Sequence, residues 1–315
     1  MTKPAVFMAQ APARQPGWIS LHVFIHDFAR LSHFVRECLG GLELPVRNNC
    51  FFIRYWVGGP HVRLRFHVPE WRERIEERVR QYLRLHPVEG TLDPTRFYAA
   101  YHSYREAEPD WYWCESGSMH YIDYQPEPER YGGPAGLSLC ETYFAWDSNM
   151  VIRILHEQPD SACQTIMLGY CLVHLTVLRQ LGLRSSYLRT VHGVASDGEI
   201  AAYVERFLQC DPRALPAGLL LARQQFYDRS YFQEYLPSLQ ARLHLLAHDL
   251  SARHVEDIPR IFDALLHMSF NRIGIGPRRE RTVRLTALYL ENHCLPDSSN
   301  LENKNEKTAT NSNQL

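Results

Sequence analysis

The chain has 315 residues, of which 45% are hydrophobic and 22% are charged, and its formal net charge is −1. This length allows one large or two ordinary domains with sizeable cores. The balanced charge provides no overall field to attract nucleic acid or an anionic membrane, so we expect no direct nucleic-acid or membrane partner. The sequence begins without a secretory signal and lacks the ~18 unbroken apolar residues of a membrane span, which predicts a cytoplasmic protein.

The eight cysteines are scattered, with no CxxC pair and no Cys/His cluster at zinc-ligand spacing. We therefore expect reduced, mostly buried thiols and no metal. Residues 1–16 predict a flexible arm, and the polar residues 297–315 predict a disordered tail. Between them, residues 17–296 are expected to form one domain, with an α+β part at 17–136 and a helical part at 137–296.

The sequence of the first part of this domain, residues 17–136, predicts an antiparallel sheet with packed helices. Alternating and aromatic stretches predict strands at residues 18–25, 50–57, 61–68 and 111–124. Helical spacing predicts helices at residues 27–39 and 69–85, the first with Asp27 as its N-cap. Gly58-Gly59-Pro60 between two of the strands is a hairpin signal.

The second part has helical spacing and little strand signal. Helices are predicted at residues 137–156, 162–181, 199–207, 232–250, 255–272 and 281–292. The expected fold class is therefore α+β, an N-terminal antiparallel sheet with packed helices followed by a mainly helical C-terminal half.

The strand after the hairpin turn alternates strictly between apolar and basic residues. His61, Arg63, Arg65 and His67 share one face, and the two arginines would project about 7 Å apart. Such a pair suits a carboxylate or phosphate, because each guanidinium offers a planar fork of donors. The same alternation also fits the solvated outer face of an antiparallel sheet.

A second group of reactive residues lies in the loop at residues 127–133. It contains Arg130 and Tyr131 followed by Gly132 and Gly133, and the glycines would allow a ligand to approach the backbone closely. The alternative is a structural turn in which Glu127 or Glu129 pairs with the arginine.

A third group lies on or at the end of a predicted helix. His267 and Asn271 are four residues apart and share a face, and Arg272 lies one step further round. A single helical histidine is also compatible with a packed or surface role. If the three groups converged, guanidinium groups would hold a carboxylate or stabilise an enolate, and a histidine would move a proton. No Walker loop, dinucleotide fingerprint or nucleophile elbow competes with this interpretation.

The order of these motifs resembles one protein family. From about Trp18 to Leu290 the chain is similar to the C-terminal (SpaB_C-like, thiopeptide-type bacteriocin biosynthesis) domain of class I lanthipeptide dehydratases. The segments that carry the resemblance are Phe52-Ile53-Arg54-Tyr55, Pro60 to Phe66, Glu129-Arg130-Tyr131-Gly132-Gly133, Phe144 with Asp147-Ser148, and His267-Met268 with Asn271-Arg272. No segment resembles the large glutamylation domain, so a stand-alone member is expected.

The resemblance implies a lyase of lantibiotic or thiopeptide biosynthesis. Such a domain removes glutamate from a glutamylated Ser or Thr of a precursor peptide and leaves dehydroalanine or dehydrobutyrine. By this resemblance Arg63, Arg65, Arg130 and His267 are the catalytic candidates. The substrate-binding candidates are His61, Tyr131, Asn271 and Arg272. We expect Arg63 and Arg65 to face a pocket shared with Arg130 and His267.

Two other activities remain open. A related small enzyme of thiopeptide pathways, a pyridine synthase, joins two dehydroalanines in a formal [4+2] cycloaddition and releases the leader peptide. A non-catalytic peptide-binding role is the third possibility. The resemblance implies no cofactor, and its expected partners are a ribosomally made precursor peptide, with leader and core, and a separate tRNA-dependent glutamylation protein. Whether the protein is a homodimer is left open by the sequence.

Overall fold

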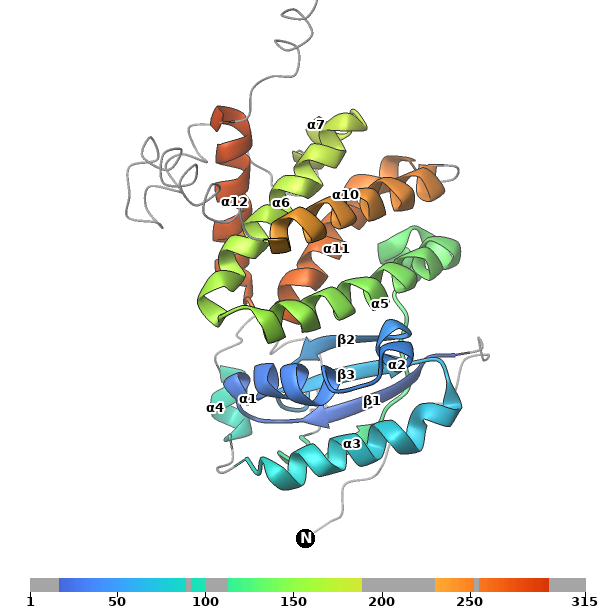
Figure 1. Ribbon diagram of the computed structural model, residues 1–315, viewed down its shortest axis with the longest axis vertical. Helices are drawn as coiled ribbons and strands as arrows, with labels where there is room; N and C mark the ends of the chain where they lie inside the picture. Colours follow the sequence, from blue (N-terminus) through green and yellow to red (C-terminus); the bar gives the residue numbers. More distant parts are fainter. Residues whose placement is uncertain (1–16, 89–91, 100–112, 189–229, 252–254, 295–315) are drawn as a thin grey trace, which may run out of the picture. The chain divides into compact units, whose positions relative to one another are not determined.

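The computed structural model describes residues 17–88, 92–99, 113–188, 230–251 and 255–294. The chain divides into two compact units, Met1–Gln125 and Pro126–Leu315. Figure 1 shows a sheet with helices in the first unit and a set of helices in the second. The predicted arm, the predicted tail and the predicted helix at residues 199–207 lie outside the described residues.

The first unit is built on a four-stranded antiparallel sheet. Its strands are β1 (Ile19–Phe24), β2 (Cys50–Tyr55), β3 (His61–Phe66) and β4 (Met119–Tyr121), in the order β2-β3-β1-β4. This sheet and the helical second unit confirm the α+β fold class. The predicted hairpin is also confirmed, because β2 and β3 pair in register across Gly58 and Gly59, whose φ angles are 87° and 107°.

The helices of the first unit begin and end where local signals place them. Helix α1 (Phe28–His33) continues into a π-helix (Phe34–Leu39), and the side chain of Asp27 accepts hydrogen bonds from the backbone of Ala29 and Arg30. Helix α3 (Arg72–Leu85) follows a short 3₁₀ turn. Two short helices, α2 (Leu44–Asn48) and α4 (Pro94–Ala99), were not expected from the sequence.

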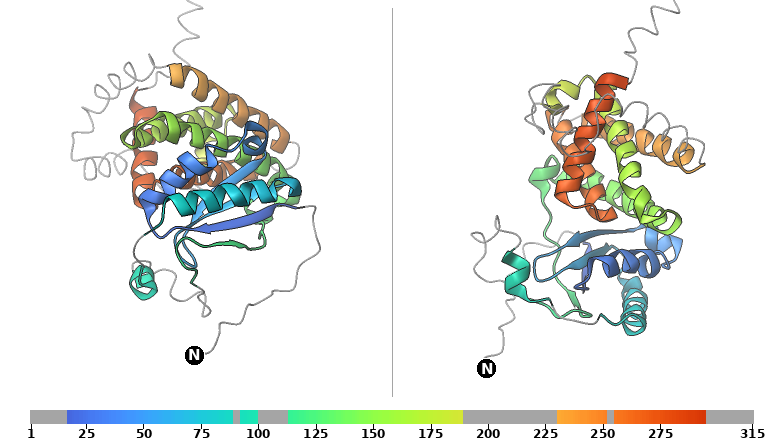
Figure 2. Two further views of the ribbon diagram at one scale, coloured as in Figure 1. Left: turned by 60° about the horizontal axis from the view of Figure 1, so that its bottom comes forward. Right: turned by 90° about the vertical axis from the view of Figure 1, so that its left-hand side faces the viewer.

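One face of the sheet is apolar and is covered by helices. Leu21, Val23 and Leu64 lie on this face and are at most 1% exposed. Tyr121 shares their parity, and its hydroxyl donates to Glu76 of α3, which places α3 on this face. Figure 2 shows α1 and α3 beside the strands. The opposite face therefore carries the other parity of each strand.

The second unit is helical throughout its described part. It contains a 3₁₀ turn (Pro128–Tyr131) followed by α5 (Gly133–Glu157), α6 (Cys163–Gln180), α7 (Arg184–Tyr187), α10 (Ser230–Ser251), α11 (Ile258–Ile273) and α12 (Pro277–Cys294). Helix α6 packs against α10 and α12, and α11 packs against α5 and α6. The segment Asp160–Gln180, which includes α6, is apolar enough to cross a membrane, but 61% of its apolar window is buried, as in a core helix.

The turn between α11 and α12 brings residues of the two helices together. Gly274 has a φ of 91°, and its backbone N–H donates to Phe270 and Asn271, while Ile275 donates to Phe270. This pattern is a Schellman motif, which ends α11 and reverses the chain. The first turn of α12 is thereby set beside the last turns of α11.

Candidate active site

The polar face of the sheet in the first unit is a row of basic groups. Across β1 and β3 the pairs on this face are Ser20 with Arg65, His22 with Arg63, and Phe24 with His61. The predicted alternation of β3 is therefore confirmed. The face is not the solvated surface that alternation also allowed, because His61 is 0% and Arg65 is 7% exposed.

His61 is held by both of its ring nitrogens. Nδ1 lies 2.7 Å from the carbonyl oxygen of Gly59, and Nε2 lies 3.2 Å from Nε of Arg63. A carbonyl can only accept, so Nδ1 carries the proton and Nε2 accepts from the guanidinium. Burial lowers the pKa of His61 to about 3, which keeps the ring neutral and Nε2 able to accept. His61 thus orients Arg63, and neither nitrogen is left for a substrate.

Aromatic rings flank both arginines of β3. The guanidinium carbon of Arg63 lies 3.5 Å from the ring centroid of Tyr55, and that of Arg65 lies 4.4 Å from the ring of Tyr124. Cation–π contacts of this kind favour the charged group and restrict its rotation. The two arginines are therefore held as cations in fixed orientations.

His22 is a member of this face that the sequence interpretation did not single out. It is 3% exposed, its ring stacks on that of His61 at 5.0 Å, and it lies opposite both Arg63 and His120 in the sheet. Burial first, and the positive neighbours second, lower its pKa to about 2. The parity of residues 18–25 was the available signal, because it puts His22 beside the arginine row once the strands are paired. His67, by contrast, lies beyond the end of β3 and is exposed.

The glycine loop forms the entry to α5 in the second unit. Gly132 and Gly133 have φ angles of 78° and 83°, and Arg130 pairs with Glu127 at 3.3 Å on the surface. An exposed pair of this kind contributes about 0–1 kcal/mol, so it leaves Arg130 able to exchange partners. Tyr131 is 4% exposed, and burial raises the pKa of its hydroxyl to about 12.

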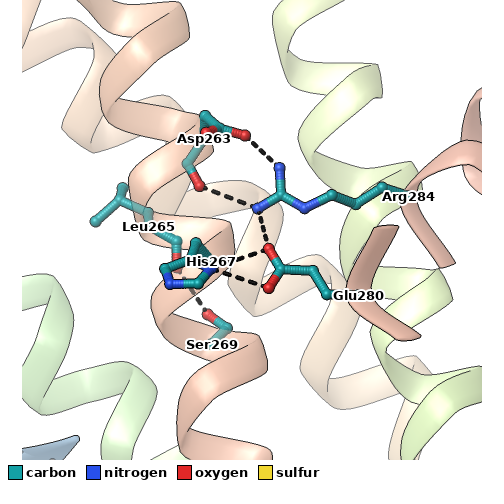
Figure 3. A network of polar contacts seen from close by, with 6 residues as sticks. All are labelled: Asp263, Leu265, His267, Ser269, Glu280 and Arg284. Carbon is teal, nitrogen blue, oxygen red and sulfur yellow. Dashed lines mark hydrogen bonds and ion pairs between the residues drawn. The ribbon is translucent and has the colours of Figure 1, made fainter. Parts of the chain in front are cut away.

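His267 on α11 is held by a glutamate of α12. Nδ1 lies 2.9 Å and 3.1 Å from the two carboxylate oxygens of Glu280, which is 8% exposed, whereas His267 is 36% exposed. A carboxylate accepts from Nδ1–H, so the neutral ring carries its lone pair on Nε2. Figure 3 shows that this nitrogen lies on the far side of the ring from Glu280. The geometry suits a general base whose tautomer is fixed.

The two remaining predicted site residues also lie on α11. Arg272 is 0% exposed and donates to Asp147 of α5 at 2.7 Å, and Ser269 donates to the same oxygen at 3.0 Å. This buried pair links α11 to α5. Asn271 is half-buried, and its carbonyl accepts from Gly274 at the end of the helix.

The structure brings some of the predicted residues together within each unit. His61, Arg63 and Arg65 gather on the sheet of the first unit, and Arg260 of α11 ties the glycine loop to the helix of His267 by a 2.6 Å bond to the carbonyl of Glu129 in the second. The shared pocket would require residues of both units and stays a prediction. Glu280 was missed because its role depends on the turn at Gly274. The only signal was a glutamate in the first turn after a helix-ending glycine.

Comparison with known proteins finds one matching family model and several solved structures of similar fold. Residues 18–290 match the family model described as "Lantibiotic biosynthesis dehydratase C-term". The pyridine synthase TbtD from thiomuracin biosynthesis is similar over 88% of this chain and 98% of TbtD, with 17% identity and a TM-score of 0.54. TsrL is similar over 88% of this chain and 95% of its own, with 16% identity and a TM-score of 0.57.

Part of a larger dehydratase shares the fold as well. The tRNA-dependent lantibiotic dehydratase MibB from Microbispora sp. 107891 is 19% identical over 89% of this chain, with a TM-score of 0.52, and the match spans 28% of MibB. At these identities the similarity to solved structures shows the fold alone. A comparison with curated protein sequences finds no match.

Proposed function

Because the chain belongs to the family of lantibiotic biosynthesis dehydratase C-terminal domains, we propose that it eliminates glutamate from glutamylated Ser or Thr residues of a ribosomally made precursor peptide. The product would be dehydroalanine or dehydrobutyrine. The observation that carries this proposal is the His267–Glu280 pair, which fixes one protonated nitrogen and one basic nitrogen in a half-exposed position.

In the proposed reaction Nε2 of His267 removes the α-proton of the glutamylated residue. The electron pair left on the α-carbon forms the new double bond as the bond between the β-carbon and the ester oxygen breaks, and glutamate leaves as its carboxylate. Guanidinium groups stabilise the negative charge that develops on the peptide carbonyl and bind the leaving glutamate. Arg63, Arg65 and Arg130 are the candidates for these tasks.

The test uses a peptide that already carries a glutamyl ester on serine, so that no glutamylation step is needed. Wild-type protein should convert it to the dehydroalanine peptide with release of glutamate, followed by mass spectrometry. His267→Ala should lower the rate about 10²–10⁴-fold, the range of general-base catalysis. His244→Ala, which removes a histidine of α10 bonded to Gln180, is the control and should retain the rate. Equal release by wild type and His267→Ala would rule out this mechanism.

A second candidate is the pyridine-forming [4+2] cycloaddition of two dehydroalanines with release of the leader peptide. Its support is the fold shared with TbtD over 98% of that protein. The discriminating substrate is a peptide that is already dehydrated. A pyridine synthase would release its leader as a separate fragment, whereas an eliminase would leave it unchanged. Binding of both peptides without either reaction would indicate a peptide-binding partner.

The proposed setting follows from the chemistry. A separate protein that uses glutamyl-tRNA would supply the glutamylated peptide, because the reaction consumes an ester that the chain's own proposed site does not make. The enzyme would act in the cytoplasm, where the precursor and the charged tRNA are made.

A further inference from the structure

A chain of four charged or titratable side chains in the second unit ends at His267. Asp263 of α11 pairs with Nη1 of Arg284 on α12, and Nη2 of Arg284 lies 2.6 Å from Oε1 of Glu280. Glu280 in turn accepts from His267. Figure 3 shows the guanidinium between the two carboxylates, with the imidazole at the end of the chain.

The inner members of this chain are withdrawn from water. The side chains of Arg284 and Glu280 are each 8% exposed, whereas those of Asp263 and His267 are 31% and 36% exposed. Charges interact more strongly where water is excluded. The state of Glu280 is therefore coupled closely to Arg284 on one side and to His267 on the other.

Three titratable side chains of helices α6 and α7 lie near this chain and carry no charge of their own at neutral pH. Burial raises the pKa of the Tyr187 hydroxyl, raises that of the Cys171 thiol to about 12 and lowers that of His174 to about 4, so all three are uncharged at neutral pH. Burial opposes the charge on Arg284, but three neighbours more than offset it and its pKa is raised. These are Tyr187, which acts only in the alkaline range where its own hydroxyl ionises, and the carboxylates of Asp263 and Glu280.

The charges of these four side chains cancel only when His267 is protonated. Two carboxylates and one guanidinium carry a net charge of −1 when His267 is neutral and of 0 when His267 is protonated. Removing Arg284 leaves two carboxylates to favour the imidazolium, whereas neutralising Glu280 removes its direct partner.

We propose that Arg284 is a positioning residue that holds Glu280 as an ionised acceptor against Nδ1 of His267. By doing so it fixes the tautomer of the histidine and limits its tendency to hold a proton. Its importance for turnover rests on the proposed elimination reaction, whereas its effect on the imidazole does not. A purely structural link between α11 and α12 would affect stability and leave the imidazole unchanged.

The first experiment measures the imidazole in the free protein. With ¹⁵N-labelled histidine, the His267 signals are assigned by comparison with His267→Gln and followed through a pH titration. Arg284→Gln should move the His267 midpoint up by about one pH unit, and Glu280→Gln should move it down by about one, the lower end of the effect of a neighbouring charge. Wild type should show the Nδ1–H tautomer when neutral.

Two further variants separate positioning from stability. Arg284→Lys keeps the charge but not the two-sided contact, so its midpoint should stay within about 0.3 pH units of wild type. Arg184→Gln is the matched control, because Arg184 of α7 pairs with Glu291 of α12 at 2.8 Å and lies in neither the catalytic nor the proposed positioning set. If Arg284→Gln fails to fold, the Glu280→Gln titration still tests the proposal, because an unchanged His267 midpoint in that variant would show that Glu280 is not an ionised partner of the imidazole and would overturn it.

The second experiment measures the pH dependence of glutamate release. The acidic limb should move to higher pH in Arg284→Gln and to lower pH in Glu280→Gln, with a loss in kcat of about tenfold or more in each and little change in KM. Shifts in the same direction, no shift, or an equal shift in Arg184→Gln would overturn the positioning role. Opposite shifts in the titration without any glutamate release would instead overturn the proposed function.

Discussion

The buried pair between Asp147 and Arg272 allows a prediction whose size follows from its geometry. Both side chains are 0% exposed, and the ion pair of 2.7 Å is accompanied by the bond from Ser269. Asp147→Asn leaves a guanidinium that cannot give up its proton in a site that is closed to solvent. Breaking one partner of such a pair costs about 3–5 kcal/mol, so we expect that loss in the free energy of unfolding at every pH where the protein folds.

When the arginine is removed instead, the loss in the free energy of unfolding should depend on pH. Burial raises the pKa of Asp147, against the opposing effects of Arg272 and Ser269, so in Arg272→Met the carboxyl can take up a proton in the folded state. The folded state then binds more protons than the unfolded one, and its stability rises as the pH falls from the raised pKa toward about 3.9, the unfolded value. The loss in Arg272→Met should therefore shrink on acidification, whereas the loss in Asp147→Asn should persist.

The assay is urea unfolding followed by circular dichroism between pH 5 and 8. The double variant Asp147→Asn/Arg272→Met should be more stable than Asp147→Asn alone, because it leaves no buried charge. Arg153→Met is the control on α5, since Arg153 makes only surface pairs with Glu157 and Glu234 among the ion pairs described, and should cost about 0–1 kcal/mol. A loss below about 1 kcal/mol in Asp147→Asn, or additive losses in the double variant, would refute the reasoning.

Three smaller predictions test other parts of the structure. His61→Phe removes the acceptor of Arg63 while keeping a buried ring, and should lower kcat/KM for glutamate release about tenfold, with little effect if His61 only fills space. Gly133→Ala meets open space but has a φ of 83°, so it should cost about 1–2 kcal/mol in chemical denaturation, whereas Gly276→Ala, also in open space at an ordinary φ, should cost nothing. Asp27→Ala removes the cap of α1 and should lower the unfolding free energy by about 1 kcal/mol, a loss that Asp27→Asn should largely avoid.

Elements with local signals were predictable from the sequence. The cap at Asp27, the hairpin at Gly58-Gly59 and the alternation of β3 each depend on residues close together in the chain. The strand predicted at 111–124 is limited to Met119–Tyr121 in the described part, because a turn from Glu115 to Ser118 with Gly117 at a φ of 83° precedes it. A run of aromatic residues alone does not reveal such a turn.

The features of the site that escaped prediction depend on tertiary contacts. Alternation assigns His61 to a face but cannot say whether that face is buried, and burial is what keeps its ring neutral. Glu280 and His267 are 13 residues apart on two helices, and they meet only because the chain reverses at Gly274. The family resemblance pointed to His267 as a candidate, but its contact with Glu280 could be found only from the geometry of the turn.

The polar face of the sheet and the His267 site differ in whether their positive charge depends on pH. The four strands of the described sheet contain no Asp or Glu. Burial lowers the pKa of His22 to about 2 and that of His61 to about 3, so we expect both rings to stay neutral when a carboxylate binds near them. The positive charge available for a carboxylate therefore comes from Arg63 and Arg65, which do not titrate. If glutamate binds to this face, its affinity should be nearly independent of pH.

Glutamate binding can be measured by calorimetry from pH 5.5 to 8, a range in which glutamate itself keeps its charge. The protein for this measurement carries Asn in place of the exposed His67 and His120 and the half-exposed His267. The buried imidazoles that remain in question in the first unit are those of His22, His61 and His26, which neighbours His61. The dissociation constant should vary by less than about threefold over this range. A gain of about tenfold on acidification would mean that one of these three imidazoles takes up a proton with the ligand. If that imidazole is His61, its role as a neutral acceptor is wrong, because an imidazolium has no lone pair to offer the guanidinium.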